Sequence, residues 1–163
     1  MIAHVIGVDP GLVHTGVVSM VFIPADKKIV VCHLVVDGPD PEAVKEWIAG
    51  THPNLKPFIF VERYVPRQRL STDERMVKAE VAFMTGLTGA KWIRNTGVKR
   101  VVSPELMNML GVWTFPAVTH HQDLRSAARI GLYGMMKNPH LNGVLADAIR
   151  DHLDGVEWVR EDA

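Results

Sequence analysis

Three carboxylates occupy positions at which an acid needs an explanation. Asp9 ends the apolar run HVIGV, and Glu62 ends the run FIFV, where a buried strand ordinarily continues with an apolar residue. Asp123 lies in the first turn of an expected helix. Two neighbouring carboxylates repel each other, so a cation, a shared proton or a substrate is needed to stabilise them side by side. Clusters of two or three carboxylates with retained waters are how proteins hold Mg²⁺ or Mn²⁺.

Each of these acids also has an ordinary structural interpretation. Asp9 belongs to an Asp-Pro-Gly sequence, which is common turn chemistry. Glu62 fits a strand-end charge paired with Arg63 or with a lysine elsewhere in the chain, and Asp123 fits a helix N-terminal acid favoured by the helix dipole. The three positions taken together are more informative than any one of them.

The hydrophobic pattern predicts the elements that position these acids. Runs rich in β-branched residues predict strands at five places: 4–8, 16–23, 28–36, 57–62 and 98–102. Helical periodicity and capping residues predict helices at five more: about 41–50, 72–87, 103–110, 120–136 and 142–153. Residues 111–119 are expected to form a loop.

This order of elements predicts an α/β fold with a five-stranded mixed sheet flanked by helices. The first three strands form an antiparallel meander, and strands four and five run parallel to strand one because helices intervene. Neighbouring parallel strands bring their carboxyl ends together, so Asp9 and Glu62 are expected to point into one place. We expect a single domain over 1–163, with an acidic C-terminal helix and tail over about 140–163.

Charge is distributed unevenly along the chain. The 18 basic and 18 acidic residues cancel, which gives no overall attraction to nucleic acid. Residues 63–100 nevertheless hold nine Lys or Arg against three acids, enough for one basic face. The single cysteine, Cys32, excludes an internal disulfide and fits a reducing compartment.

The apolar runs are short. None approaches the roughly eighteen residues of a spanning helix, so we expect neither a membrane segment nor a secretory signal. The expected location is the cytoplasm.

The segment IGVDPGLVHTGVV resembles the first motif of RuvC-type Holliday-junction resolvases, which have a ribonuclease-H-like fold. FVERY resembles the second motif, in which a strand ends in the catalytic Glu, and HHQDLRSAARIGLYG resembles the final one. Two segments between them are similar to the family's dimer-interface helix and its strand-Pro-helix unit: KAEVAFMTGLTGA and VVSPELMNMLG. The likeness covers residues 1–137 in the family's order.

Carried over residue by residue, the resemblance implies that Asp9 and Glu62 are catalytic metal ligands. The family's last motif has two metal-binding residues three apart, the first being Asp or His. One alignment gives His120 and Asp123, and another pairs Asp123 with Ser126 and loses one acid. The expected catalytic and metal-binding residues are Asp9, Glu62, Asp123 and His120, with His121 or Ser126 as alternatives to His120. The expected cofactor is Mg²⁺ or Mn²⁺, two ions per active site.

The segment RYVPRQRL leaves the expected site directly after Glu62. Its arginines can hold phosphates, and its tyrosine can stack on an unpaired base. Where the resolvases tend to have a lysine in the Pro-helix unit, this chain has Asn108, and Lys99, Arg100 or Arg125 are candidates for the missing charge. The expected DNA-binding residues are Arg63, Tyr64, Arg67, Arg69, Lys99 and Arg100.

The resemblance implies a homodimeric endonuclease that cuts four-way (Holliday) and other branched DNA junctions by two-metal phosphodiester hydrolysis. The compact, divergent form suggests a bacteriophage or other mobile-element version, which would act in the cytoplasm of a bacterium or of an infected host cell. Local support for the dimer is an apolar stripe that could equally be core: Val77, Val81, Met84 and Thr88.

Two other functions are open from the sequence alone. A junction-binding recombination accessory protein with weak catalysis would fit Ser126 and Asn108. GVDPGLVHTG also resembles the phosphate-binding loop of actin-like and sugar-kinase ATPases, although that fold normally needs two such domains and over twice this length.

Overall fold

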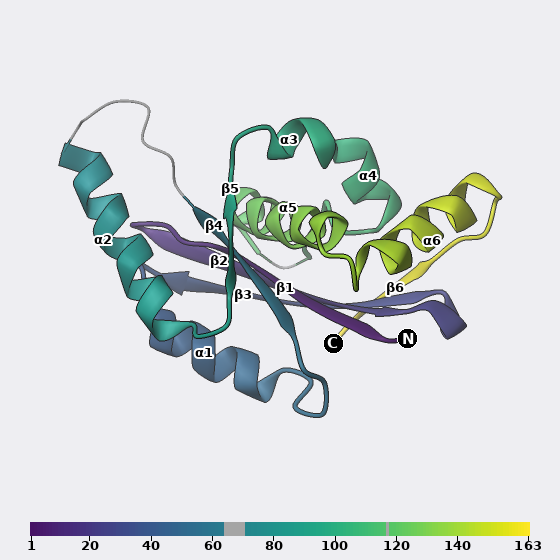
Figure 1. Ribbon diagram of the computed structural model, residues 1–163, viewed down its shortest axis with the longest axis horizontal. Coiled ribbons are helices and arrows are strands. Elements are labelled where there is room, and N and C mark those ends of the chain that lie inside the picture. The colour runs from purple at the N-terminus through teal and green to yellow at the C-terminus, as the bar shows by residue number, and fades with distance from the viewer. Residues whose placement is uncertain (64–70, 117) are drawn as a thin grey trace.

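A mixed β-sheet with helices on both faces forms the centre of the molecule (Figure 1). The computed structural model describes residues 1–63, 71–116 and 118–163. Within these residues the strands form one six-stranded sheet in the order β5-β4-β1-β2-β3-β6. The strands are β1 (Ala3–Asp9), β2 (His14–Ile23), β3 (Lys28–Asp37), β4 (Phe58–Arg63), β5 (Lys91–Arg94) and β6 (Val159–Asp162).

The strand directions confirm the predicted α/β class. β1, β2 and β3 form an antiparallel meander, in which a short turn of 3-10 helix, η1 (Pro24–Asp26), connects β2 to β3. β4 runs parallel to β1, and β5 runs parallel to β4. Parallel neighbours need a crossover connection, which a helix provides each time.

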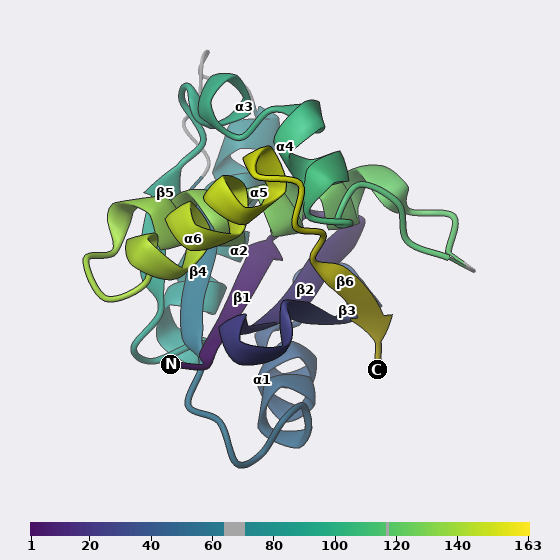
Figure 2. The same cartoon turned by 90° about the vertical axis from the view of Figure 1, so that its right-hand side faces the viewer.

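The helices cover the two faces of the sheet unequally. α1 (Pro41–Gly50) and α2 (Ser71–Gly86) lie on one face, where both contribute to the same apolar core, and Figure 2 shows α1 on that face from the side. The other face carries α5 (His121–Lys137), joined by α3 (Val98–Val101), α4 (Pro104–Met109) and α6 (Asn142–Leu153). Each face has its own apolar core, so the central strand β1 is buried along almost its whole length.

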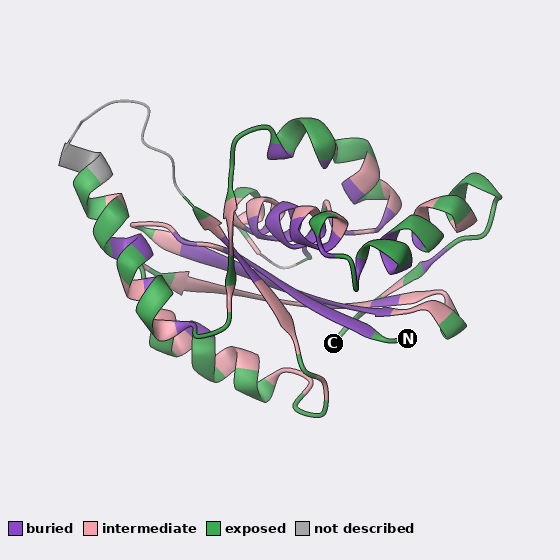
Figure 3. Cartoon of the chain, viewed as in Figure 1, coloured by how far each residue is buried: buried purple, intermediate pink, exposed green. Residues whose placement is uncertain are grey.

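α5 is the most deeply placed helix and lies flat on the sheet (Figure 3). Its sheet-facing side includes Leu124, Ala127 and Ala128, none of which is exposed to solvent. Small residues on this side let the helix axis come close to β1 and β2. The position of α5 therefore fixes where its first turn meets the end of β1.

The strand predicted over 98–102 is wrong, because these residues form α3 and its C-cap. Gly97 adopts the left-handed conformation, with φ of 78°, and begins the helical turn. Val98 and Val102, four residues apart, are both buried on one side, which is the helical and not the strand period. The strand next to β4 is instead β5, a short segment that the pattern did not predict.

A further strand lies in the predicted acidic tail. β6 pairs in parallel with the first residues of β3. Arg160 fixes it to the loop before α5, since its guanidinium donates to the carbonyls of Gly111 and Thr114 and lies over the ring of Phe115. Among the described residues, no helix combines the length and apolarity needed to cross a membrane.

Candidate functional site

Asp9 and Glu62 lie next to each other at the carboxyl edge of the sheet. β1 and β4 are parallel neighbours whose register pairs Val8 with Val61. The following residues, Asp9 and Glu62, are therefore at the same level and face the same side. Both are half-buried, and Glu62 is close enough to Asp9 to raise the pKa of the Asp9 carboxyl.

Helix α5 reaches this edge because glycines let it lie directly on the strands. A Cβ at Gly7 of β1 would collide with the carbonyl oxygen of Ala127, and a Cβ at Gly16 of β2 would lie 2.5 Å from the carbonyl oxygen of Asp123. Gly16 is the register partner of Asp9. The first turn of α5 is thus held against the end of β1, which brings Asp123 to the other two acids.

The Asp9 carboxyl shows the electrostatic consequence of this arrangement. Its pKa is raised well above its usual range, first by burial and then by hydrogen bonding to, and repulsion from, Glu62. The charge of Asp123 raises the pKa of Asp9 further, whereas a hydrogen bond with Ser126 lowers it. Negative charge therefore accumulates at one point, and an ionised Asp9 needs a cation there.

The histidines before α5 lie beside Asp123. His120 Nδ1 is 3.7 Å from Asp123 Oδ2, and its ring stacks on that of His14, with centroids 4.1 Å apart. The Nδ1 atom of His121 is buried without a hydrogen-bond partner among the described residues. Asp123 and Ser126 both affect the pKa of Asp9. These are the two residues that one of the two alignments of the last motif pairs.

The donor set suits a hard divalent cation. Carboxylate oxygens are preferred ligands of Mg²⁺ and Mn²⁺. Across the described parts of the chain, no group of three or more His, Cys, Asp or Glu side chains is close enough to enclose a metal ion. Mg²⁺ does not require such a cage, since it keeps several waters and binds through one or two carboxylates together with substrate phosphates. Asp9, Glu62 and Asp123 fit an open site of that kind.

A further acid, Glu80 of α2, faces the same place, although no sequence motif singles it out. It lines a cavity of about 90 Å³ together with Asp9, Pro10, Glu62 and Met76. Burial raises the pKa of Glu80, while Arg63, with Nε 3.3 Å from Oε1, opposes the shift. The sequence feature that could have identified Glu80 is its place, as a charged residue, on the buried side of an amphipathic helix.

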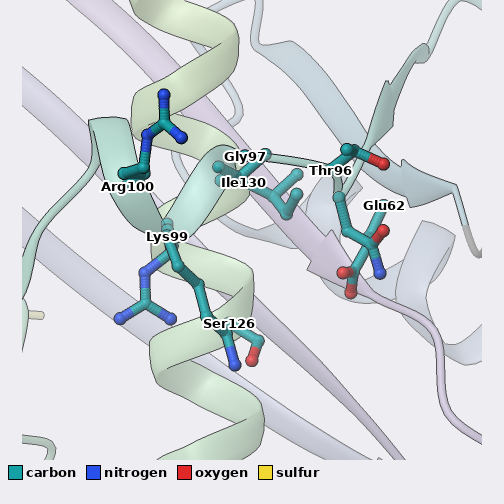
Figure 4. Close-up of a pocket in the computed structure, with 10 residues that line it drawn as sticks. Glu62, Thr96, Gly97, Lys99, Arg100, Ser126 and Ile130 are labelled. Carbon is teal, nitrogen blue, oxygen red and sulfur yellow. The ribbon is translucent and has the colours of Figure 1, made fainter.

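A larger cavity, of about 490 Å³, also borders Glu62 (Figure 4). Its walls are the end of β4, the segment 95–100 and the α5 residues Ser126, Arg129 and Ile130. In Figure 4, Lys99 extends toward Ser126, whereas Arg100 points away from both Ser126 and Glu62. Basic side chains thus share a cavity with one of the clustered acids.

The residues predicted to contact DNA differ in their surroundings. Lys99 and Arg100 line the larger cavity. Arg63 has a side chain that is 52% exposed and is paired with Glu80. Three predicted residues lie outside the described part of the chain: Tyr64, Arg67 and Arg69.

The candidates for the missing basic residue are also placed. Arg125 donates from Nε to the carbonyl of Trp113 and stacks on that ring at 4.1 Å, which holds it away from the larger cavity. Asn108 donates to the carbonyl of Pro104 within α4. Arg129, which the sequence motifs do not single out, is buried in the cavity wall.

Comparison with known proteins identifies the fold. No protein-family model and no curated protein sequence matches the chain. Among solved structures it is similar to T. thermophilus RuvC in complex with a Holliday junction substrate, with a TM-score of 0.51 and 19% identity over 83% of this chain and 96% of that one. A second T. thermophilus RuvC structure gives a TM-score of 0.50 and 17% identity over 84% and 97%. The fold is RuvC-like.

The predicted ribonuclease-H-like fold is thereby confirmed. A fowlpox virus resolvase, crystallised with substrate Holliday junction DNA, gives a TM-score of 0.47 and 12% identity over 84% of this chain and 98% of that one. At these identities the likeness concerns the RuvC-like architecture, and the chemistry has to be argued from the residues of the site.

Proposed function

We propose that the protein is a divalent-metal-dependent endodeoxyribonuclease that cuts four-way DNA junctions, with other branched DNA as further substrates. The observation that supports this most is the convergence of Asp9, Glu62 and Asp123 at the carboxyl edge of a RuvC-like sheet. An architecture shared with a RuvC that was crystallised on a Holliday junction substrate favours the same class of DNA. Lys99 and Arg100, which line the cavity that Glu62 borders, favour a phosphate-containing substrate.

In this proposal Asp9, Glu62 and Asp123 hold Mg²⁺ or Mn²⁺, with His120 as an additional ligand beside Asp123. Two such ions, when bound, activate water and stabilise the departing oxygen of a phosphodiester. The Ser126 hydroxyl favours the ionised form of Asp9. Lys99, directed toward Ser126, offsets the charge of a DNA strand that approaches the acids.

A labelled four-way junction tests the proposed function directly. Incubation with Mg²⁺ or Mn²⁺ should give paired nicks in opposed strands, and EDTA should remove them. A linear duplex of the same sequence is the control and should remain uncut under the same conditions. Absence of a metal-dependent product, or equal cutting of the duplex, would contradict the proposal.

A second candidate is a junction-binding protein with weak catalytic activity. Two observations favour it: Ser126 stands where one family alignment places an acid, and the described residues contain no closed three-donor group. Such a protein would bind the junction at the same affinity with and without metal and give no product. The junction assay therefore separates the two candidates.

We also propose that the protein is a homodimer through α2. Val77, Val81 and Met84 recur along one face of this helix and are 44%, 51% and 50% exposed, so they are surface residues of the protomer and not core. A row of exposed apolar side chains is typical of an association surface. Two-fold symmetry would allow two sites to act on opposed strands.

Val81→Glu should convert the dimer to a monomer, weakening self-association at least about tenfold, because a charge would be buried at the centre of the contact. Light scattering coupled to size-exclusion chromatography measures the change. Val101→Glu is the matched control, since Val101 lies on α3 and is equally exposed, at 50%. A monomeric wild-type protein, or a Val81→Glu variant that remains dimeric, would overturn the proposed interface.

A further inference from the structure

Arg129 is a buried cation that the proposed catalytic set does not use. It lies on α5, one turn after Ser126, and is 6% exposed. Its Nε donates to the carbonyl of Val102 at 3.1 Å, so the guanidinium is held between α3 and α5. Burial and the nearby Arg125 lower the pKa of Arg129, whereas Glu62, which lines the same cavity, raises it.

This guanidinium lacks a carboxylate partner within the described structure. None of the ion pairs between described residues includes Arg129. Burying a charge without a partner is costly, and proteins ordinarily compensate with a counter-ion or with hydrogen bonds to every donor. The bond to Val102 uses only Nε, and the terminal nitrogens form the fork that binds phosphate in two places.

The cavity beside Arg129 has the size and chemistry for a phosphate-bearing group. Its volume of about 490 Å³ falls within the range of about 300–1,000 Å³ typical of ligand sites. Lys99 and Arg100 of α3 line it, and Lys99 extends toward Ser126, while Ser126 and Thr96 add hydroxyl groups. Glu62 is the only acidic side chain among the residues described as its lining.

We propose that Arg129 anchors a backbone phosphodiester of the DNA strand in this cavity, with Lys99 as the second cation, next to the bond that is cut. The inference rests on the proposed nuclease function and adds a positioning residue to it. Where the resolvases tend to have a lysine, this chain has the uncharged Asn108. In this proposal Arg129 supplies the positive charge instead. A phosphate held here lies beside Glu62, so the same contact aligns the strand with the acids.

The test measures DNA binding in EDTA, where no cleavage occurs. A fluorescent four-way junction is titrated with wild type and with Arg129→Gln at several KCl concentrations, and folding is checked by circular dichroism. Loss of one phosphate contact should weaken binding about tenfold and reduce the slope of log affinity against log salt by about 0.9. A merely structural role would leave that slope unchanged.

Arg125→Gln is the matched control, because Arg125 lies on the same helix and binds a backbone carbonyl but does not line the cavity. It should keep the wild-type slope. Arg129→Lys keeps the charge and remains informative if Arg129→Gln does not fold. It should keep the slope and bind at least about threefold more weakly, since the two-point contact is lost. Wild-type affinity in Arg129→Lys, or a wild-type slope in folded Arg129→Gln, would overturn the inference.

Two further measurements, phosphate binding and cleavage, distinguish failure of this inference from failure of the proposed nuclease function. Stabilisation of the wild type by inorganic phosphate, together with unchanged DNA binding by Arg129→Gln, would assign the cavity to a free anion and overturn the strand contact. A wild type that binds but never cuts, with the slope reduced in Arg129→Gln, would refute the nuclease and leave the phosphate contact standing. Cleavage by the wild type and by Arg129→Gln at equal rates would refute the positioning role alone.

Discussion

Asp9→Asn is expected to abolish junction cleavage while junction binding is retained or tightened. A loss of about a thousandfold or more corresponds to about 4 kcal/mol of transition-state stabilisation, the scale on which bound metal ions act. Asparagine keeps the size of the side chain but removes a charge from the acid cluster. Binding should not suffer, because one source of repulsion toward phosphate disappears. Single-turnover cleavage and fluorescence anisotropy measure the two effects separately.

The same substitution should stabilise the metal-free protein. The raised pKa of Asp9 means that folding favours its protonated form. The stabilisation that this gives is complete below about pH 3.9, the pKa of an unfolded aspartate, and is lost as the pH rises through the raised value. Asp9→Asn has no such loss, so its melting temperature should exceed that of the wild type at neutral pH. About 1 kcal/mol would appear as about 2–4 °C.

Asp37→Asn is the control for both measurements. Asp37 ends β3 at the same edge of the sheet, but pairs with His14 and lies outside the acid cluster. It should leave cleavage close to the wild-type rate and give no rise in stability. A parallel loss of folding and cleavage in Asp9→Asn would refute the catalytic role of Asp9.

Gly7→Ala should be the most destabilising conservative change in β1. Its Cβ would overlap the carbonyl oxygen of Ala127 and approach the backbone of Gly131, and a backbone cannot move aside as a side chain can. We expect a loss of about 3 kcal/mol or more, seen as a lower denaturation midpoint in urea. A displaced α5 also moves Asp123, and misplacement by about 1 Å can cost about a hundredfold in rate.

Gly143→Ala provides the contrast. Gly143 lies in the first turn of α6, and a Cβ there meets no atom within 4 Å. Because alanine favours helix, this variant should be neutral or slightly more stable, by up to about 1 kcal/mol. If Gly7→Ala were equally well tolerated, the close contact between α5 and β1 could not be what positions Asp123.

The sequence predicted the central part of the fold well for a physical reason. Alternating and continuous apolar runs mark β1 to β4, and a helix between two strands implies that they are parallel. That reasoning is local, and it places Asp9 and Glu62 together without further information. Asp123 needed the resemblance, because nothing near it in the sequence shows that Gly7 and Gly16 open a path for α5.

The errors fall where the structure depends on distant contacts. β-branched residues over 98–102 predicted a strand, but Gly97 begins a helical turn that buries Val98 and Val102 against the core beneath α5. β6 exists through its pairing with β3 and through Arg160, which reaches a loop almost fifty residues earlier in the chain. Glu80 and Arg129 were missed because an ion on an amphipathic helix ordinarily faces solvent.

The sheet's outermost strands have a consequence for handling the protein. β5 and β6 are four residues each and rich in charge, and short charged edges discourage pairing with other chains. β3, with the sequence KIVVCHLVVD, is ten residues long and strongly apolar, and β6 covers its first part. Without β6 that stretch would present an aggregation-prone edge. We therefore expect truncations that remove β6, or tags fused within it, to lower the solubility of the protein.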